Sequence, residues 1–476
     1  MNLYLKNIDK VIFITSCSSL ILILCLNQLP ILGILIILSL ILILSLLNEV
    51  TVMRFSLYFM ILSWFSLDTL WLAGRNVPIN IKYLIDIINI ILMFKILFKN
   101  KKYNLNNVFR DKILILSIIF IFVSVFKWII FNYSLLEFFN GIRIYLRFLP
   151  FYIIIKNNND QRLLCDLKFI IILQIPILLM QVIKYTNQDM IGGTFGIYGQ
   201  TYLFILLIPV FFYILNKYLK KDISIYKMLL SAIIILSICA INETKIAFFI
   251  FPIICIIMLI LFNEKYSFYR KIFFTLMISF SMIVSFKLLI NRYDGMDKLF
   301  SDKNTIINYA TKNNNPLFYL GRLENFNYIK DVELKSFSNN LVGIGIGRAL
   351  QDEFFAVNHF SNGRIVNQIP LSEKYLELQH YGYFLSSLNT FYFENGIIGI
   401  LIYLFILFIL FKRCVFNIKI IKNINITSLS YAFSALIISW IPLFYYNDIF
   451  YQYQTSTIFW ILAALISKYY YDVKLD

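Results

Sequence analysis

The sequence predicts an all-α polytopic integral membrane protein of about 12–14 transmembrane helices, with one long extracytoplasmic loop between the late helices. Composition is the first reason: the 476 residues are 60% hydrophobic and 14% charged, with a mean hydropathy of +0.76, well above the roughly half-apolar usage of soluble domains. The second reason is that apolar runs long enough to cross a ~30 Å hydrocarbon core recur along the chain. Backbone groups must be paired inside a bilayer, so each run is expected to be a helix. The ~10-residue alternating segments of a β-barrel do not occur.

About fourteen spans follow from these runs. They lie near Val11–Leu29, Ile31–Leu47, Val52–Leu72, Ile79–Phe98, Ile113–Phe131, Phe138–Ile155, Phe169–Thr186, Thr201–Leu219, Tyr226–Asn242, Ile246–Phe262, Ile272–Ile290, Phe391–Phe411, Ser428–Asn447 and Ile449–Ser467. The first run resembles a signal peptide, but no small-x-small cleavage site follows it, and we interpret it as a retained helix. The six cysteines have no metal-ligand spacing, which favours buried packing.

Lysine and arginine are concentrated in alternate connectors, and this predicts the orientation. The basic connectors are KNKKYNLNNVFRDK, KNNNDQRLLCDLK, NKYLKKDISIYK, NEKYSFYRK and KRCVFNIKIIKNIN. The connectors between them, QLP, FNYS, NETK and YYND, are short and nearly free of Lys and Arg. The positive-inside rule therefore places both termini in the cytoplasm. The position of the basic residues explains the net charge of +17, so no nucleic-acid partner is predicted.

One long polar passage, Asn291–Thr390, interrupts the apolar pattern and contains both histidines, His359 and His380. It divides the chain into a membrane domain of about eleven helices (1–290), the loop itself (291–390) and a membrane domain of about three helices (391–476). The same topology places the loop outside. Its acidic and basic residues balance, and long loops are in any case exempt from the charge rule.

Two segments of the loop have local patterns. RLENFNYIKDVELKSF spaces its apolar residues mostly at helical intervals and predicts an amphipathic helix lying on the membrane domain. NNLVGIGIGRA is rich in turn residues, and its alternate glycines permit positive φ or a close backbone approach. A helix around Leu376–Asn389 is expected to lead back into the membrane. We expect the loop to cover a site at the outer surface and to form part of it.

Arg143 and Arg147, in FFNGIRIYLRFLP, are the strongest candidates outside the loop. A charge at membrane depth costs at least ~2.5–3.5 kcal/mol and usually has a counter-charge or a substrate. The i, i+4 spacing places both on one helix face, with Arg143 roughly 8 Å below the outer surface. Their guanidinium groups match the geometry of a diphosphate. The alternative is snorkelling to the headgroups or pairing with Glu137.

Three further sets of residues could serve a site. Glu243 and Lys245 lie at a tight outer connection, where they either form a local ion pair or face the same cavity. The glycines of MIGGTFGIYGQTYL allow close approach to a ligand, although turn geometry explains them equally well. His380 precedes the returning helix, where a neutral imidazole could accept a proton from an attacking hydroxyl, although a lone histidine is often structural. No metal or cofactor motif is found.

The order of these features resembles the O-antigen polymerase and O-antigen ligase superfamily of bacterial envelope biogenesis. The similar features are a Gly-Thr-Phe-Gly turn (Gly193–Gly196), a polar NETK connection and one long outer loop late in the chain. In that loop, family members tend to have an Arg-led helix, a glycine-alternating turn and a terminal Glu-x-Gly-x-x-Gly motif. The corresponding residues here are Arg322, Gly343, Gly345, Gly347 and Glu394–Gly399. The resemblance covers most of the chain in layout but only short motifs in residues, and NETK departs from the Ser-Arg form of many members.

The resemblance implies an undecaprenyl-diphosphate-linked oligosaccharide as donor, without nucleotide sugar, metal or cofactor. It implies Arg322 as a donor contact, with Arg143 and Arg147 as companions, and places His380 where the ligases have a loop histidine thought to act as base. The catalytic candidates are therefore His380 and Arg322, and the substrate-binding candidates are Arg143, Arg147, Lys245 and Glu243. The implied location is the bacterial cytoplasmic membrane, with a flippase and a chain-length regulator as possible partners.

We interpret the chain as a metal-independent glycosyltransferase that polymerises O-antigen or capsule repeat units. A reaction with a diphosphate leaving group depends on electrostatic stabilisation more than on covalent catalysis. Arginines and one base would supply what it needs. Two alternatives stay open. One is an O-antigen ligase that transfers the glycan to lipid A core, and the other is a flippase or transporter of the same lipid-linked glycan. Transporters commonly have related halves with broken helices and midplane charges, whereas a single asymmetric loop dominates this sequence.

Overall fold

The computed structural model describes residues 10–25, 30–69, 81–98, 110–158, 162–185, 191–196, 199–262, 268–292, 304, 320–348, 386–450 and 453–475. In these residues all regular structure is helical and no strand occurs, which confirms the predicted helical class for this part of the chain. His359, His380 and most of the predicted helix Leu376–Asn389 lie outside the described residues.

The described part of the chain forms α-helices and two short turns of other helix types. In chain order they are α2 (Lys10–Cys25), α3 (Pro30–Leu46), α4 (Glu49–Thr69), α5 (Ile81–Phe98), α7 (Lys112–Phe131), α8 (Leu135–Leu146), α9 (Leu149–Asn157), α10 (Arg162–Lys184), the 3₁₀ turn η3 (Gly193–Phe195), α11 (Gln200–Leu219), α12 (Ile225–Ile241), α13 (Lys245–Leu261), α14 (Phe268–Arg292), α17 (Arg322–Tyr328), the π-helical turn η5 (Ile329–Glu333), α18 (Phe337–Val342), α21 (Ser387–Ile420), α22 (Ile424–Tyr446) and α23 (Tyr453–Leu475).

Six helical segments among the described residues are long and apolar enough to cross a membrane. They are Lys112–Phe131, Leu135–Asn157, Arg162–Lys184, Gln200–Leu219, Ser387–Ile420 and Ile424–Tyr446. The second of these contains a break between α8 and α9, because Pro150 in the first turn of α9 has no N–H to donate to the preceding turn. The predicted span Phe391–Phe411 is longer at both ends in the structure, where α21 covers Ser387–Ile420.

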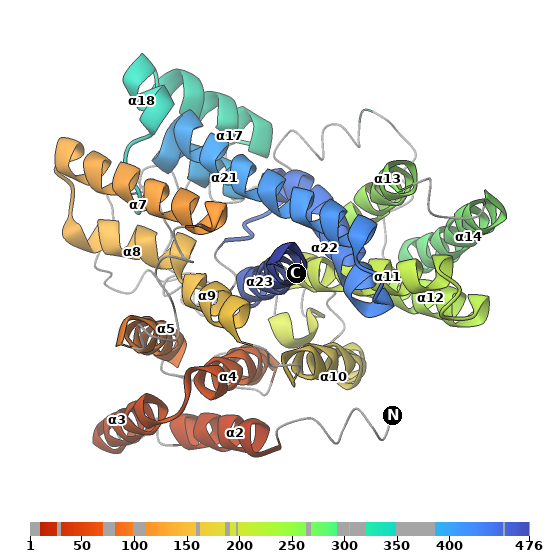
Figure 1. The fold of residues 1–476 in the computed structure, drawn as a ribbon, viewed down its shortest axis with the longest axis horizontal. Helices are drawn as coiled ribbons and strands as arrows, with labels where there is room; N and C mark the ends of the chain where they lie inside the picture. Colours follow the sequence, from red (N-terminus) through yellow and green to blue (C-terminus); the bar gives the residue numbers. More distant parts are fainter. Residues whose placement is uncertain are drawn as a thin grey trace.

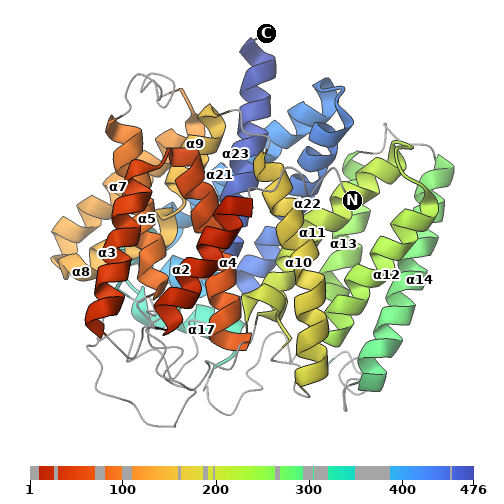
Figure 2. The same cartoon turned by 90° about the horizontal axis from the view of Figure 1, so that it is seen from below.

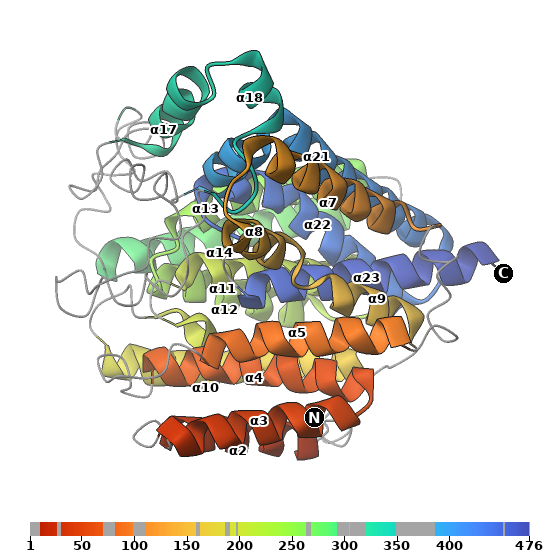
Figure 3. The same ribbon diagram turned by 90° about the vertical axis from the view of Figure 1, so that its left-hand side faces the viewer.

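The helices pack in layers around a central group. Figure 3 shows α2 and α3, then α4 and α10, and then α5 in successive layers beside α8 and α9. In Figure 1, α22 and α23 lie in the middle, between α9 on one side and α11 on the other. Outer faces are apolar too: Phe122 and Phe126 of α7 and Leu401 and Phe405 of α21 are each more than half exposed. Apolar side chains therefore cover the outside of the bundle as well as filling its core.

The polar segment 320–348 lies at one end of this bundle. Figure 2 shows α17 at that end and the C-terminal end of α23 at the opposite end. The prediction of a single amphipathic helix here is wrong in detail, since α17 continues only into η5 and a separate helix, α18, follows. Helix α18 begins after Ser336, whose Oγ accepts a hydrogen bond from Asn339 N at 3.1 Å. The apolar residues of the predicted helix nevertheless pack against the bundle, because Ile329 and Leu334 are fully buried against α21.

The glycine turn and the start of α21 form one interlocked unit. Gly396 has φ 61° and ψ −164° inside α21, and the carbonyls just before such a break lack intrahelical partners. The carbonyls of Phe393 and Glu394 accept hydrogen bonds from the N–H groups of Ile344 (3.0 Å) and Gly345 (3.1 Å). The next carbonyl, that of Asn395, accepts one from Lys127 Nζ at 3.2 Å. The polar segment is therefore fixed to α21 by main-chain bonds.

Gly396→Ala is expected to destabilise the protein by roughly 1–3 kcal/mol, the usual cost of a backbone conformation that only glycine adopts readily. A Cβ there would also lie 2.5 Å from Gly343 N and Leu341 O, which are main-chain atoms that cannot move aside cheaply. Unfolding of the purified protein in detergent measures the loss. Leu401→Ala, on the exposed side of the same helix, is the control. Equal effects of the two substitutions would contradict the interlock.

Candidate functional site

Arg143 lies on α8 and pairs with an acid from α5. Its Nη1 is 3.0 Å from Asp86 Oδ2, and Tyr453 Oη donates to the same oxygen at 3.2 Å. The helix is positioned locally by Ser134, whose side chain caps it by accepting a hydrogen bond from Leu136 N at 3.2 Å. Asp86 of α5 thus supplies a counter-charge for Arg143.

Arg147, the residue that ends α8, is held from two sides. Its side chain is buried, and Nη2 donates to the main-chain carbonyl of Phe450 at 3.1 Å. The guanidinium carbon lies 3.7 Å from the centroid of the Tyr453 ring, within the range of a cation–π contact. The plane of the guanidinium is therefore fixed against the start of α23, which is what a group that recognises a ligand by geometry requires.

Arg322 is the first residue of α17 and is fixed to the neighbouring connector. Its Nε donates to the carbonyl of Tyr446 at 2.6 Å, and its guanidinium lies 4.5 Å from the centroid of the Tyr446 ring. Asn389 of α21 donates through Nδ2 to the Arg322 carbonyl at 3.1 Å. The connector is fastened to the same helix, because Ser387 Oγ donates to Asp448 Oδ1 at 3.0 Å.

These contacts link three predicted arginines to the α22–α23 connection and the start of α23. Arg322 and Arg147 bind carbonyls only four residues apart, those of Tyr446 and Phe450, on either side of the α22–α23 turn. Arg143 joins through Asp86, which also binds Tyr453 just beyond that turn. Arg147 and Arg322 therefore bind main-chain carbonyls on either side of the α22–α23 connection, and Arg143 is linked to the start of α23 through Asp86.

Asp86 is the member of this group that the sequence reading missed. The signal was present, because Asp86 is a carboxylate inside the predicted span Ile79–Phe98, and a charge at that depth is expected to have a partner or a function. What the sequence does not contain is the pairing itself, since the two residues are 57 positions apart.

Glu243 and Lys245 form an ion pair, with Lys245 Nζ 2.8 Å from Glu243 Oε1. Glu243 has φ 56°, so the acid and the base are brought together by a tight turn between α12 and α13. The distance agrees with the local ion pair, one of the two interpretations of the NETK connection.

Protein groups fill the space around the Gly192–Gly196 turn. Gln174 Nε2 donates to Thr194 Oγ1 at 2.8 Å, and the main-chain N–H of Thr194 donates to Gln174 Oε1 at 3.0 Å. Gln181 bonds both the N–H and the carbonyl of Gly193. Gln454 of α23 donates to the Thr194 carbonyl at 3.0 Å. The close backbone approach allowed by these glycines is therefore used for packing against α10 and α23.

A buried acid and a buried base lie on the other side of α8. The side chains of Glu394 and Lys127 are almost fully buried, and Tyr145 Oη donates to Glu394 Oε2 at 3.0 Å. Because Lys127 also binds the Asn395 carbonyl, the Glu-x-Gly-x-x-Gly motif connects α7, α8 and α21. The glutamate of the motif thus has a clear packing role beneath the helix that carries Arg143 and Arg147.

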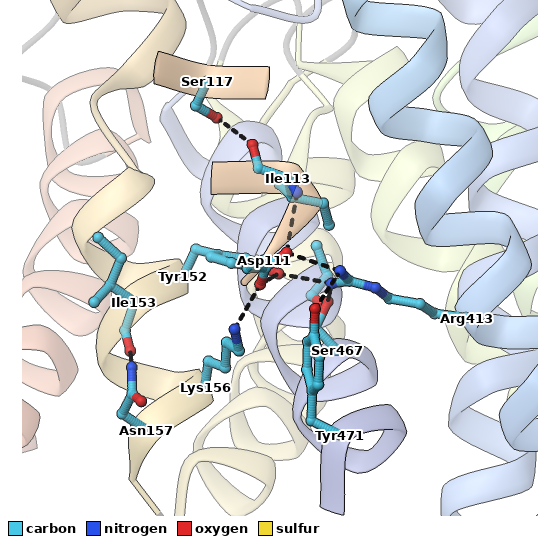
Figure 4. A network of polar contacts seen from close by, with 11 residues as sticks. Asp111, Ile113, Ser117, Tyr152, Ile153, Lys156, Asn157, Arg413, Ser467 and Tyr471 are labelled. Carbon is cyan, nitrogen blue, oxygen red and sulfur yellow. Dashed lines mark hydrogen bonds and ion pairs between the residues drawn. The ribbon is translucent and has the colours of Figure 1, made fainter. Parts of the chain in front are cut away.

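A second polar network lies near the other end of α7 (Figure 4). Asp111 is fully buried and accepts hydrogen bonds from Arg413 Nη2, Lys156 Nζ and Tyr152 Oη, each at 2.7 Å. Burial alone would raise the pKa of Asp111, but the charges and hydrogen bonds of Arg413 and Lys156 outweigh it and hold the pKa below its ordinary value. The network includes Tyr152, which lies only five residues after Arg147 in the chain. It is fully bonded, as expected of a structural connection between α7, α9 and α21.

Comparison of the chain with protein-family models and with curated proteins finds no match. The assignment of a function therefore depends on the geometry of the site.

Proposed function

We propose that this protein polymerises lipid-linked oligosaccharide repeat units, by glycosyl transfer from a polyprenyl-diphosphate-linked donor at the outer face of the cytoplasmic membrane. One observation carries the proposal. Two arginines, Arg147 from a long apolar helical segment and Arg322 from the polar segment 320–348, bind main-chain carbonyls on either side of the α22–α23 connection, and Arg143 is linked to the start of α23 through Asp86. A lipid-linked diphosphate presents its charge at the end of an apolar chain, which is the arrangement these groups match.

Two features support a membrane as the environment. Six segments have the length and hydropathy of membrane spans. The helices also expose large apolar side chains over their outer faces, and soluble monomers rarely expose contiguous apolar surface on this scale.

The arginines suit a reaction with an anionic leaving group. In the proposed step the hydroxyl oxygen of the acceptor unit bonds to the anomeric carbon of the donor. The bond from that carbon to the diphosphate oxygen breaks, and the hydroxyl proton passes to a base. Fixed guanidinium groups at Arg143, Arg147 and Arg322 would stabilise the charge that develops on the diphosphate. His380, the proposed base, lies outside the described residues.

Reconstitution tests the proposal directly. The purified protein is placed in liposomes with a polyprenyl-diphosphate-linked repeat unit, and the carrier-linked glycans are separated by length. Elongation without a partner protein is the expected result. Movement of the lipid across the bilayer without elongation would overturn the proposal in favour of a transporter.

Carrier-linked glycans in a deletion strain separate the polymerase from the ligase. A polymerase deletion leaves glycans of a single repeat, since units still arrive but are not joined. A strain that accumulates long chains on the carrier would identify the protein as the ligase, because polymerisation would then be intact and transfer lost.

A further inference from the structure

Helices α5 and α8, which are joined by the Asp86–Arg143 pair, both contain buried hydrogen-bonding groups that the protein itself does not satisfy. Asp86 and Asn89 of α5 are 9% and 5% exposed, and at i, i+3 spacing they share one helix face. Asp86 Oδ1, both amide atoms of Asn89 and Nδ2 of Asn140 on α8 are buried without a hydrogen-bond partner. Buried polar atoms are nearly always bonded, so several unsatisfied atoms on two helices joined by an ion pair require an explanation.

The other carboxylate oxygen shows that this arrangement is fixed. Asp86 Oδ2 is held by Arg143 at 3.0 Å and by Tyr453 at 3.2 Å, so the orientation of the carboxylate is set while Oδ1 has no hydrogen-bond partner. Asn140 precedes Arg143 by three residues and therefore lies on the same face of α8. For Asn89 the amide orientation does not matter, because both of its atoms lack partners.

The unsatisfied groups define the chemistry of what would bind them. Asp86 Oδ1 and the Asn89 carbonyl oxygen need hydrogen-bond donors, whereas the Asn89 and Asn140 amide nitrogens need acceptors. Phosphate oxygens at neutral pH mainly accept, so they would leave the carboxylate unsatisfied. A metal cation would satisfy only the oxygens and would lie beside Arg143. A hydroxyl both donates and accepts, and a sugar carries several at fixed spacing.

We infer that Asp86, Asn89 and Asn140 bind the hydroxyl groups of the sugar nearest the diphosphate and so select the glycan that the protein accepts. This inference rests on the proposed function, because it places that sugar beside arginines that bind the diphosphate. The α5 residues would then act in specificity, and Asp86 would serve both purposes, with Oδ2 orienting Arg143 and Oδ1 contacting the sugar.

The test substitutes Asn89 by Leu, which keeps the approximate size and removes both hydrogen-bonding groups. Wild type and Asn89→Leu are reconstituted with the full donor and with a series of donors, each lacking one hydroxyl of the first sugar. We expect kcat/KM for the full donor to fall about 10-fold or more in the variant. For one deoxy donor, kcat/KM of the wild type should be lower than for the full donor. Asn89→Leu should use that deoxy donor and the full donor with the same kcat/KM. Ile90→Leu, on the exposed side of α5, is the matched control and should leave the series unchanged.

A second readout does not need turnover. Thermal stabilisation of the protein by each donor reports binding. The same deoxy donor should stabilise the wild type less than the full donor does. The two donors should stabilise Asn89→Leu to the same extent. Wild type that binds without elongation would remove the polymerase proposal and leave the sugar contact standing. If the unsatisfied groups hold only water, Asn89→Leu will match wild type in rate and in stabilisation by every donor, and that result overturns the inference.

Discussion

Arg147→Ala is expected to reduce elongation of a lipid-linked donor by about 10²- to 10³-fold, the usual cost of removing one preorganised group that stabilises a developing negative charge. The guanidinium of Arg147 is oriented by the Phe450 carbonyl and by the Tyr453 ring, so its effect should come from a defined direction as well as from its charge. The measurement is the initial elongation rate of the reconstituted protein at a saturating donor concentration.

Arg147→Lys separates charge from geometry. Lysine keeps the positive charge but loses the planar fork and its contact with the Tyr453 ring, so we expect a rate between those of wild type and Arg147→Ala. Because Arg147 is buried, its substitution can also lower stability. The loss of rate is therefore interpreted only where the protein level and the melting temperature of the variant equal those of the wild type. A wild-type rate in Arg147→Lys would exclude a bidentate contact between the Arg147 guanidinium and the diphosphate.

A control for general loss of positive charge is available far from the arginines. Lys217 lies near the end of α11 and pairs with Asp222 at 3.0 Å, and both side chains are partly exposed. Lys217→Ala should leave elongation unchanged. A comparable fall in both variants would mean that the overall charge of the protein, and not the position of Arg147, determines the rate.

The local features of this protein could be read from its sequence because each depends on neighbouring residues. Apolar runs predict helices, and an arginine inside such a run, as at position 147, requires a partner or a function whatever surrounds it. The alternate glycines after Leu341 likewise indicated positive φ or a close backbone approach, and the structure shows both: all three have positive φ, Gly343 approaches Gly396 of α21, and Gly347 approaches Glu137 of α8.

The pairings could not be predicted, because they depend on how distant helices meet. Glu137, six residues before Arg143 on the same helix, was the partner that the sequence offered, and the structure adds Asp86 from α5 as a partner of Arg143. The predicted helix after Arg322 was broken for a similar reason. Its apolar residues are spaced for one helix, but Leu334 is buried against α21 and the chain then restarts at the Ser336 cap. Tertiary contacts outweighed local periodicity there.

The Asp111 network is the clearest pairing of this kind, and Asp111→Ala is expected to have the largest effect on stability. The substitution leaves the buried cation Arg413 and the partly buried cation Lys156 without their shared carboxylate (Figure 4). Breaking a buried ion pair by removing one partner costs about 3–5 kcal/mol. Unfolding in detergent measures the loss, and Asp222→Ala, which breaks a partly exposed pair, should cost no more than about 1 kcal/mol.

Two further measurements show whether charge is the cause. The Asp111→Ala and Arg413→Ala double variant should lose less stability than the sum of the single variants, because the second substitution removes an already uncompensated cation. The pKa of Asp111 is lowered in the folded protein, so its contribution is present above the ordinary carboxyl pKa of about 3.9 and is lost as the pH falls through the lowered value. Wild type should therefore lose more stability than Asp111→Asn on acidification below about pH 4. Additive single losses together with parallel pH curves would show that Asp111 acts through packing and not through its charge.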